Sequence, residues 1–311
     1  MKTAVDTDVI MISPEQKKNK RKKGKTILLF VLPALLVYSI FILYPIIATF
    51  NYSMYNWNGV QAQKTFIGLE NYFTLFSDST FWQALQNNML LVLVSVFVQI
   101  PLGLIMALVL FSPIMGKKFL NVIFFLPYLM STVAIGLLWI FMYDPINGPV
   151  NQIVQLFGFN AIPWLADKNT AMIAILIVVI WQFSPFYMIL FKAAMVGIPD
   201  ELYEAASIDG ANELQKFFYV TLPALIPTFV TSSILAIVGS LKAFDIFYIM
   251  TGGGPGGATE ILGTYMYKQG FINFSMGYAS TIAAVMFLIA FACVIIIQVI
   301  EYQRKKRGLF S

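Results

Sequence analysis

The sequence contains no histidine and only one cysteine, Cys293, among its 311 residues. Disulfide frameworks, zinc sites built on cysteine or histidine, and Ser-His-Asp triads all need these residue types. The sequence therefore excludes all three, and no metal site is expected. It also lacks the G-x-x-x-x-G-K-[ST] pattern of ATP-binding loops, so this chain is not expected to hydrolyse ATP alone.

Charged residues are scarce as well, at 11% of the chain, against about 25% in a soluble domain. Hydrophobic residues reach 59% and fall in runs long enough to cross about 30 Å of hydrocarbon. Because lipid offers no partner to open backbone groups, each run must be helical. The sequence predicts an all-α polytopic membrane protein with six transmembrane helices, at 26–50, 87–112, 119–143, 170–196, 224–250 and 277–301.

Lysine and arginine are distributed unevenly around these spans. Sixteen of them lie in the two terminal segments or near the loops after the second and fourth spans, whereas the other three loops hold one each. Such residues favour the cytoplasmic side, so both termini and the 197–223 loop are predicted to be cytoplasmic. The net charge of +5 reflects this flanking pattern rather than a nucleic-acid surface.

The N-terminal residues 1–25 are polar and basic and are predicted to be a cytoplasmic tail. Lys17–Lys25 resembles the start of a signal peptide, but the run that follows is too long for one and lacks a small-x-small cleavage site. An uncleaved first span is therefore expected. The predicted organisation is the tail, a six-helix domain at 26–301, and a short cytoplasmic C-terminus at 302–311.

The 197–223 loop carries the turn signals of a first short helix. Pro199 suits the first position of a helix, and Asp200 and Glu201 complement its positive start. Gly210 can adopt a positive φ and end the helix near residue 208.

A second short helix is predicted from about Asn212 to Thr221, before Pro223 stops it. The first helix would offer an apolar, small-residue surface made of Leu202, Tyr203, Ala206 and Ile208. A partner groove can take such a surface. An ordinary loop packed on its own spans explains the same pattern equally well, so the residues alone leave both interpretations open.

The spacing of this loop carries a resemblance. It reads Glu204-Ala205-Ala206, three residues, Gly210, nine residues, Val220, one residue and Leu222-Pro223. This is similar to the EAA motif of binding-protein-dependent ABC importers, with Val where Ile is usual. The resemblance implies a coupling helix that docks on a separate ATPase through Glu204, Ala205, Ala206, Asp209, Gly210, Leu222 and Pro223.

Other segments resemble one branch of that family, the MalF-like, maltose-type permeases. They are Phe66–Tyr72, Leu126–Tyr128 with Trp139 and Gly148–Asn151, and Phe244–Pro255. The resemblance covers about residues 26–305, without the long outer domain and extra N-terminal spans of the maltose protein. The C-terminus also lacks the extended tail typical of the second subunit.

This resemblance implies the type I ABC importer permease fold in a bacterial plasma membrane, with no catalytic residue and no cofactor of its own. The implied partners are a MalG-like second permease, an ABC ATPase dimer that uses ATP and Mg, and an extracytoplasmic binding protein. The implied cargo is a di- or oligosaccharide, carried by alternating access. Glycerol phosphate or another polyol remains an alternative cargo.

Polar residues inside the spans are candidates for the solute path, because they are costly in lipid. Tyr128 and Thr132 lie four apart and share a helix face. Serine and threonine can equally bond their own helix or join two helices. The resemblance selects as the substrate-binding set Tyr128, Thr132, Gln182, Phe183, Gly239, Ser240 and Ala243.

The fifth predicted span also contains Lys242 and Asp245, which lie three apart and could pair. The glycines at 252–257 match G-x-G-x-x-G, but no strand precedes them and Pro255 interrupts them, so a dinucleotide site is rejected. Instead, a possible outer gate or binding-protein contact is assigned to Asp245, Gly253, Gly254 and Pro255.

Two other function classes remain. A stand-alone secondary transporter would need an ion-coupling carboxylate deep in a span, and only Asp245 comes near. A membrane enzyme would need clustered acids at a membrane face. Its one candidate cluster, Asp200, Glu201, Glu204 and Asp209, has a spacing that suits coupling better than metal ligation.

Overall fold

A computed structural model describes residues 30–306 of the chain, which divide into two units between Asn51 and Tyr52. The first unit holds most of one apolar helix, Phe30–Tyr52, whose last part comprises the π-helical turn η1 (Ser39–Leu43) and α2 (Tyr44–Tyr52). The predicted span at 26–50 is helical from residue 30, and residues 26–29 lie outside the described part.

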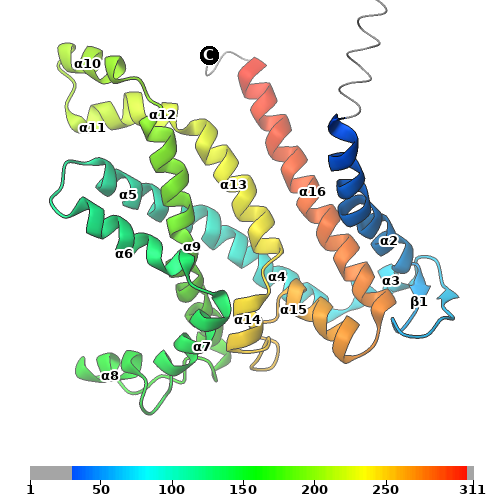
Figure 1. The fold of residues 1–311 in the computed structure, drawn as a ribbon. Helices are drawn as coiled ribbons and strands as arrows, with labels where there is room; N and C mark the ends of the chain where they lie inside the picture. Colours follow the sequence, from blue (N-terminus) through cyan, green and yellow to red (C-terminus); the bar gives the residue numbers. More distant parts are fainter. Residues whose placement is uncertain (1–29, 307–311) are drawn as a thin grey trace, which may run out of the picture. The chain divides into compact units, whose positions relative to one another are not determined.

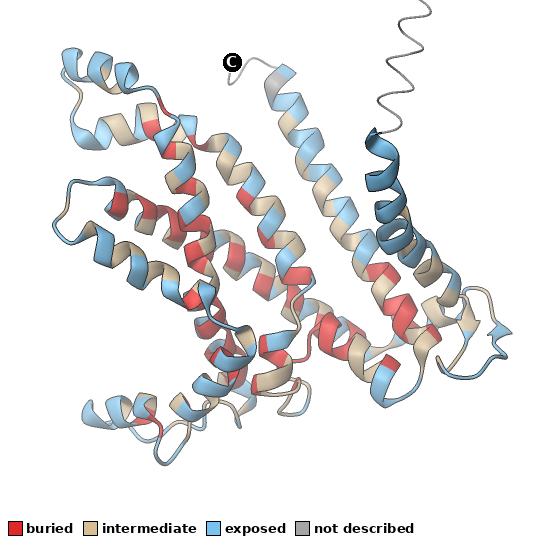
Figure 2. Cartoon of the chain, viewed as in Figure 1, coloured by how far each residue is buried: buried red, intermediate tan, exposed pale blue. Residues whose placement is uncertain are grey.

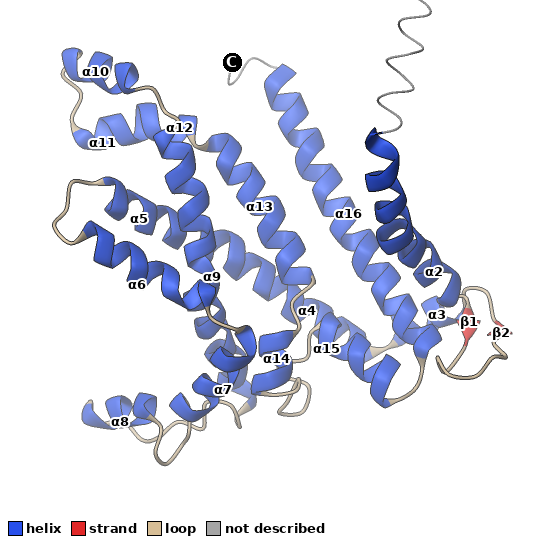
Figure 3. Cartoon of the chain, viewed as in Figure 1, coloured by secondary structure: helices blue, strands red, loops and turns tan. Residues whose placement is uncertain are grey.

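The second unit consists of helices and one two-stranded antiparallel ladder, β1 (Tyr55–Asn56) with β2 (Thr65–Phe66) (Figures 1 and 3). Its long helical elements are α4 (Ser79–Val94), η2 (Ser95–Gln99), α5 (Ile100–Phe111), α6 (Lys117–Leu129), α7 (Thr132–Met142), α9 (Lys168–Val196), α13 (Ile226–Leu241) and α16 (Met276–Lys306). The shorter ones are α3 (Glu70–Ser77), α8 (Pro149–Leu156), α14 (Asp245–Met250), α15 (Leu262–Tyr267) and η4 (Lys268–Ile272).

The all-α prediction is confirmed. Within the described residues, five helices are long and apolar enough to cross a membrane, and the number is six if a bent pair of helices is counted as one span. The second span begins at Ser79 rather than 87, because the side chain of Asp78 caps the helix by accepting from the Thr80 N–H. The last helix continues to Lys306, so part of the predicted 302–311 segment prolongs the sixth span.

The predicted third span is not one straight helix. Helices α6 and α7 meet at an angle of 97°, with Met130 in extended conformation and Ser131 at φ −58° and ψ 129° between them. The fifth span is also interrupted, at Lys242–Phe244 between α13 and α14. Hydropathy does not detect either break, because the residues at both breaks lie within apolar sequence.

Three prolines are accommodated by π-helical turns. Each π turn ends two residues before a proline: η1 before Pro45, η2 before Pro101, and η3 (Phe217–Thr221) before Pro223. A proline has no N–H, and its ring collides with the carbonyl four residues earlier. Widening the preceding turn relieves that collision while the helix continues.

Helix α9 is the centre of the second unit. More than half of its apolar window is buried, at 56%, against 17% for the corresponding window of α16. In Figure 2, buried residues gather on α9 and α5 and on the part of α16 nearest its start. The exposed Leu, Ile and Phe side chains of α16 therefore face lipid or another membrane helix rather than water.

Candidate functional site: the 197–223 loop and a polar cavity

The 197–223 loop begins with the predicted helix, α10 (Asp200–Ile208). Pro199 lies one position earlier than predicted, at the N-cap, and Asp200 and Glu201 occupy the first turn. Gly210 has φ +80° and ends the helix as expected. The Ala211 N–H then donates to the Ala206 carbonyl at 2.9 Å, closing the C-terminal turn.

The second helix of the loop starts as predicted at Asn212, which forms a reciprocal capping box with Gln215. It runs through α11 (Glu213–Lys216) and η3 into α12 (Leu222–Ala224). The prediction that Pro223 stops it was wrong, since η3 absorbs the proline and the helix bends only at Leu225. The loop is thereby joined directly to α13.

The predicted apolar surface of α10 divides into two faces. Leu202 and Ile208 are exposed, at 50% and 87%. Tyr203 and Ala206 are half-buried, and the Tyr203 hydroxyl lies 2.9 Å from the Thr221 hydroxyl. The outward face also carries four of the predicted docking residues, Glu204, Ala205, Asp209 and Gly210, while Leu222 and Pro223 are half-buried at the junction with α13.

The acidic cluster of this loop does not form a metal site in the described part of the chain, where no group of three or more candidate ligands converges. Glu213, outside that cluster, pairs with Lys216 at 2.7 Å. Helices α10 and α11 lie at one end of the second unit, and α14 and α15 lie toward the other (Figure 1).

A cavity of about 340 Å³ lies where α13 is interrupted. Its walls come from η2, the adjoining ends of α6 and α7, α9, α13 and α14. Six of the seven residues predicted to bind substrate line it: Tyr128, Thr132, Phe183, Gly239, Ser240 and Ala243. The bend between α6 and α7 brings Tyr128 and Thr132 to the same cavity, although they are not on one continuous helix.

The seventh residue, Gln182, lies behind the wall. It is 1% exposed, and its Nε2 donates to the Thr132 hydroxyl at 3.2 Å. Within the described residues no group satisfies its Oε1. Gln182 therefore orients the Thr132 hydroxyl, and its Oε1 can still accept a hydrogen bond.

The cavity has an aromatic side and a polar side. The Tyr128 ring packs near Phe183 and Phe186, with centroids 6.4 and 5.6 Å away. Ser95 and Gln99 contribute polar groups that were not among the predicted cavity residues. Both are polar residues inside a predicted span, which is the feature that marked the other candidates. Ser240 donates its hydroxyl to that of Ser95 at 3.0 Å. Aromatic faces beside hydroxyl and amide groups suit a polyhydroxylated solute.

Two charged residues also line the cavity, Lys242 and Asp245. Both are exposed, and no ion pair joins them among the described residues. The expectation that they could pair assumed a continuous helix, and the interruption at 242–244 removes that geometry.

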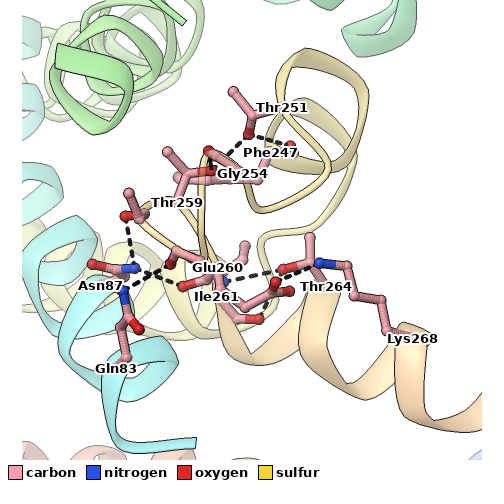
Figure 4. A network of polar contacts seen from close by, with 12 residues as sticks. Gln83, Asn87, Phe247, Thr251, Gly254, Thr259, Glu260, Ile261, Thr264 and Lys268 are labelled. Carbon is pink, nitrogen blue, oxygen red and sulfur yellow. Dashed lines mark hydrogen bonds and ion pairs between the residues drawn. The ribbon is translucent and has the colours of Figure 1, made fainter. Parts of the chain in front are cut away.

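The glycine loop, Thr251–Glu260, is tied down on several sides (Figure 4). Gln83 and Asn87 of α4 donate to the carbonyls of Gly257 and Glu260 at 3.0 and 2.7 Å. The Glu260 carboxylate pairs with Lys268 and occupies the space where a side chain at Gly253 would lie. The loop is therefore a fixed surface feature rather than a nucleotide cradle.

Asp78 connects the start of α4 to α15 and α16. It accepts hydrogen bonds from the Tyr265 and Tyr278 hydroxyls, the latter at 2.8 Å. Burial favours a higher pKa for Asp78, but the hydrogen bonds from both tyrosines and from Thr80 outweigh it and lower the pKa. Burial first, and then Asp78 itself, raise the pKa of Tyr265 to about 12.

Residues 99–307 match the family described as "Binding-protein-dependent transport system inner membrane component". The chain is 41% identical over 268 residues to "Probable ABC transporter permease protein YurN" of Bacillus subtilis, covering 85% of this chain and 91% of that protein. It is 34% identical over 280 residues to "Trehalose/maltose transport system permease protein MalF" of Thermococcus litoralis, with coverages of 89% and 94%.

Among solved structures, the fold matches a chain of a bacterial ABC transporter involved in the import of the acidic polysaccharide alginate. The TM-score is 0.80 at 22% identity, covering 93% of this chain and 99% of that one. This likeness confirms the predicted type I importer permease fold.

Proposed function

The chain belongs to the family of binding-protein-dependent transport system inner membrane components, and from this premise we propose that it is the MalF-like permease subunit of a sugar importer. The family to which it belongs and its apolar helices indicate a multi-pass membrane protein. Its proposed partners are a MalG-like permease, an ATPase dimer and an extracytoplasmic binding protein. ATP hydrolysis is left to the ATPase dimer.

The observation that carries this proposal is the exposed face of α10. Four residues of the motif in the 197–223 loop, Glu204, Ala205, Asp209 and Gly210, are exposed. The same helix is anchored to the membrane spans by the Tyr203–Thr221 contact and by the junction at Leu222 and Pro223. A partner that moves α10 would therefore also move the start of α13, which lines the cavity farther along. We place this loop in the cytoplasm, together with both termini.

A saccharide, most simply a di- or oligosaccharide, is the proposed cargo of the cavity. The aromatic rings of Tyr128 and Phe183 would cover the apolar face of a sugar ring, and Thr132, Ser95 and Ser240 would meet its hydroxyls. Support also comes from the trehalose/maltose permease among the relatives. Asp245, Gly253, Gly254 and Pro255 would lie on the side that meets the binding protein.

The test is sugar-stimulated ATP turnover in the reconstituted importer. Glu204→Lys should release the ATPase because it reverses a charge on the docking face, and Gly210→Pro should uncouple it because proline cannot adopt φ +80°. Glu70→Lys, the same change at an exposed helix start elsewhere, is the matched control and should leave ATPase retention intact. Transport that survives both loop variants would refute the proposal.

A further inference from the structure

Asn88 of α4 is fully buried, and its side chain joins two distant parts of the chain. Its Oδ1 accepts from the Leu262 N–H at 2.7 Å, and its Nδ2 donates to the Ser240 carbonyl at 2.8 Å. The three residues lie on α4, α15 and α13, which meet near the start of α15 (Figure 1). Both ends of one amide are thus occupied by backbone groups from different helices.

Both partners of Asn88 are backbone groups at the end of a helix. Leu262 is the first residue of α15, where backbone N–H groups have no partner within the helix. Ser240 lies one residue before the end of α13, where its carbonyl accepts from the Ala243 N–H at 3.3 Å, and the Asn88 amide supplies a further donor. One buried amide therefore holds two helix ends at a constant separation.

The contact at Leu262 leads to the glycine loop. Leu262 follows that loop by two residues, and the neighbouring Asn87 donates to the carbonyls of Ala258 and Glu260 at 3.1 and 2.7 Å. The turn of α15 after Leu262 also packs directly on the interruption. A Cβ at Gly263 would lie 2.4 Å from the Ala243 carbonyl oxygen, so only glycine fits there.

The contact at Ser240 leads to the cavity. Ser240 lines the cavity and donates its hydroxyl to Ser95, another lining residue, at 3.0 Å. Hydrogen bonds therefore run without a gap from the segment after the glycine loop, through Asn88, to the polar wall of the cavity. In a buried setting these bonds are strong, and leaving one unmade is costly, so their helices tend to move together.

We propose that Asn88 is a positioning residue that couples the glycine loop to the cavity wall. When a binding protein docks on the loop and shifts the start of α15, Asn88 carries the shift to the end of α13 and reshapes the cavity. This inference rests on the proposed importer function, because it needs a partner at the loop and a solute in the cavity.

The adjacent Asn87 provides a matched control. It is the same residue type on the same helix and also makes two hydrogen bonds, but both go to the carbonyls of the glycine loop and neither reaches the cavity wall. A purely structural role of such amides predicts similar effects for Asn87→Leu and Asn88→Leu. The coupling role predicts that only Asn88→Leu disconnects the loop from the cavity.

The experiment uses the full importer in proteoliposomes and measures the import ratio, which is the amount of maltose imported per ATP hydrolysed. Trehalose is a second probe, and the thermal stability of each variant is measured as well. Wild-type turnover stimulated by the sugar-loaded binding protein comes first, and its absence would count against the proposed function itself. Given that stimulation, Asn88→Leu should lower the import ratio at least about fivefold, because two hydrogen bonds are lost, while Asn87→Leu leaves the ratio unchanged. Equal ratios in both variants would overturn the proposal.

Hydrogen exchange on the unmodified importer provides a readout that needs no variant to fold. Docking of the binding protein should change exchange in residues 236–243 and 258–265 together. If the second segment responds and the first does not, the coupling proposal fails. The Asn88→Asp variant keeps the size and the acceptor; when ionised it loses the donor and places a negative charge beside the Ser240 carbonyl, and it should reproduce the lowered import ratio.

Discussion

The hydroxyl groups of Tyr203 and Thr221 lie 2.9 Å apart, so α10 is bonded to the π turn that leads into α13. Thr221 is buried, at 5% exposed, and Tyr203 is half-buried. The exposed face of α10 and helix α13, which lines the cavity, are therefore linked through one side-chain contact as well as through the backbone.

Removing that contact should uncouple ATP hydrolysis from transport. Tyr203→Phe keeps the ring and removes the hydroxyl, at a cost of about 1 kcal/mol. We expect the ATPase to stay bound while sugar uptake per ATP falls severalfold. The control is Tyr219→Phe in the same π turn, where the side chain is 80% exposed. An unchanged uptake ratio in Tyr203→Phe would show that the backbone connection alone transmits the motion.

The second prediction distinguishes Tyr128 and Thr132, which would contact the solute, from Gln182, which orients the Thr132 hydroxyl. Tyr128→Ala removes an aromatic wall of the cavity and should raise the KM for sugar most. Gln182→Met and Thr132→Val should each raise KM less, because Gln182 acts only by orienting the Thr132 hydroxyl.

A double-mutant cycle on uptake KM tests that support. The Gln182→Met/Thr132→Val double variant should behave like either single one, giving a coupling energy of about 0.5–1.5 kcal/mol. Strictly additive effects would mean that Gln182 contacts the solute independently of Thr132.

The third prediction concerns pH. The hydrogen bonds of Asp78 lower its folded pKa below the ordinary 3.8. Their stabilisation is therefore present above the unfolded pKa and is lost as the pH falls through the folded pKa. Tyr265, with its pKa raised to about 12, stays a hydrogen-bond donor until strongly alkaline pH.

Tyr265→Phe should therefore lower stability at neutral pH by about 1 kcal/mol, since Tyr265 is buried but solvent screens the half-buried Asp78 carboxylate. The difference from wild type should shrink as the pH falls below about 4. Thermal unfolding of the detergent-solubilised protein across this range is the measurement, with Tyr302→Phe as an exposed control. A difference that does not depend on pH would mean that Asp78 does not carry the effect.

The sequence allowed the spans and the 197–223 loop to be predicted because their signals are local. Apolar run length determines a transmembrane helix, and the termination of α10 at Gly210 follows from the chemistry of one residue. Six of the seven expected cavity residues line one cavity, although that expectation came from a family resemblance rather than from local physics.

The interruptions could not be predicted in the same way. Pro127 precedes a break between α6 and α7, whereas Pro185 lies inside the unbroken α9, so a proline in an apolar run does not specify the outcome. The break after α13 packs against Asn88 and α15, which are distant in sequence. Because that break was unforeseen, the relation between Lys242 and Asp245 was misjudged.

The last prediction concerns the ion pair between Glu260 and Lys268 beneath the glycine loop. The Glu260 side chain is 5% exposed and that of Lys268 is 30% exposed. One carboxylate oxygen faces the lysine, and the other has no hydrogen-bond partner among the described residues. Removing only the lysine would leave a buried charge uncompensated, which costs about 3 kcal/mol or more.

Lys268→Met should therefore lower the thermal stability of the protein strongly. Adding Glu260→Gln should restore much of it, because the buried charge is gone and the loop keeps its backbone bonds to Gln83 and Asn87. Lys168→Met is the control, as this lysine is exposed and forms no ion pair within the described residues. If the double variant is no more stable than Lys268→Met alone, the carboxylate is not charged in the folded protein, and the glycine loop is held by its hydrogen bonds instead.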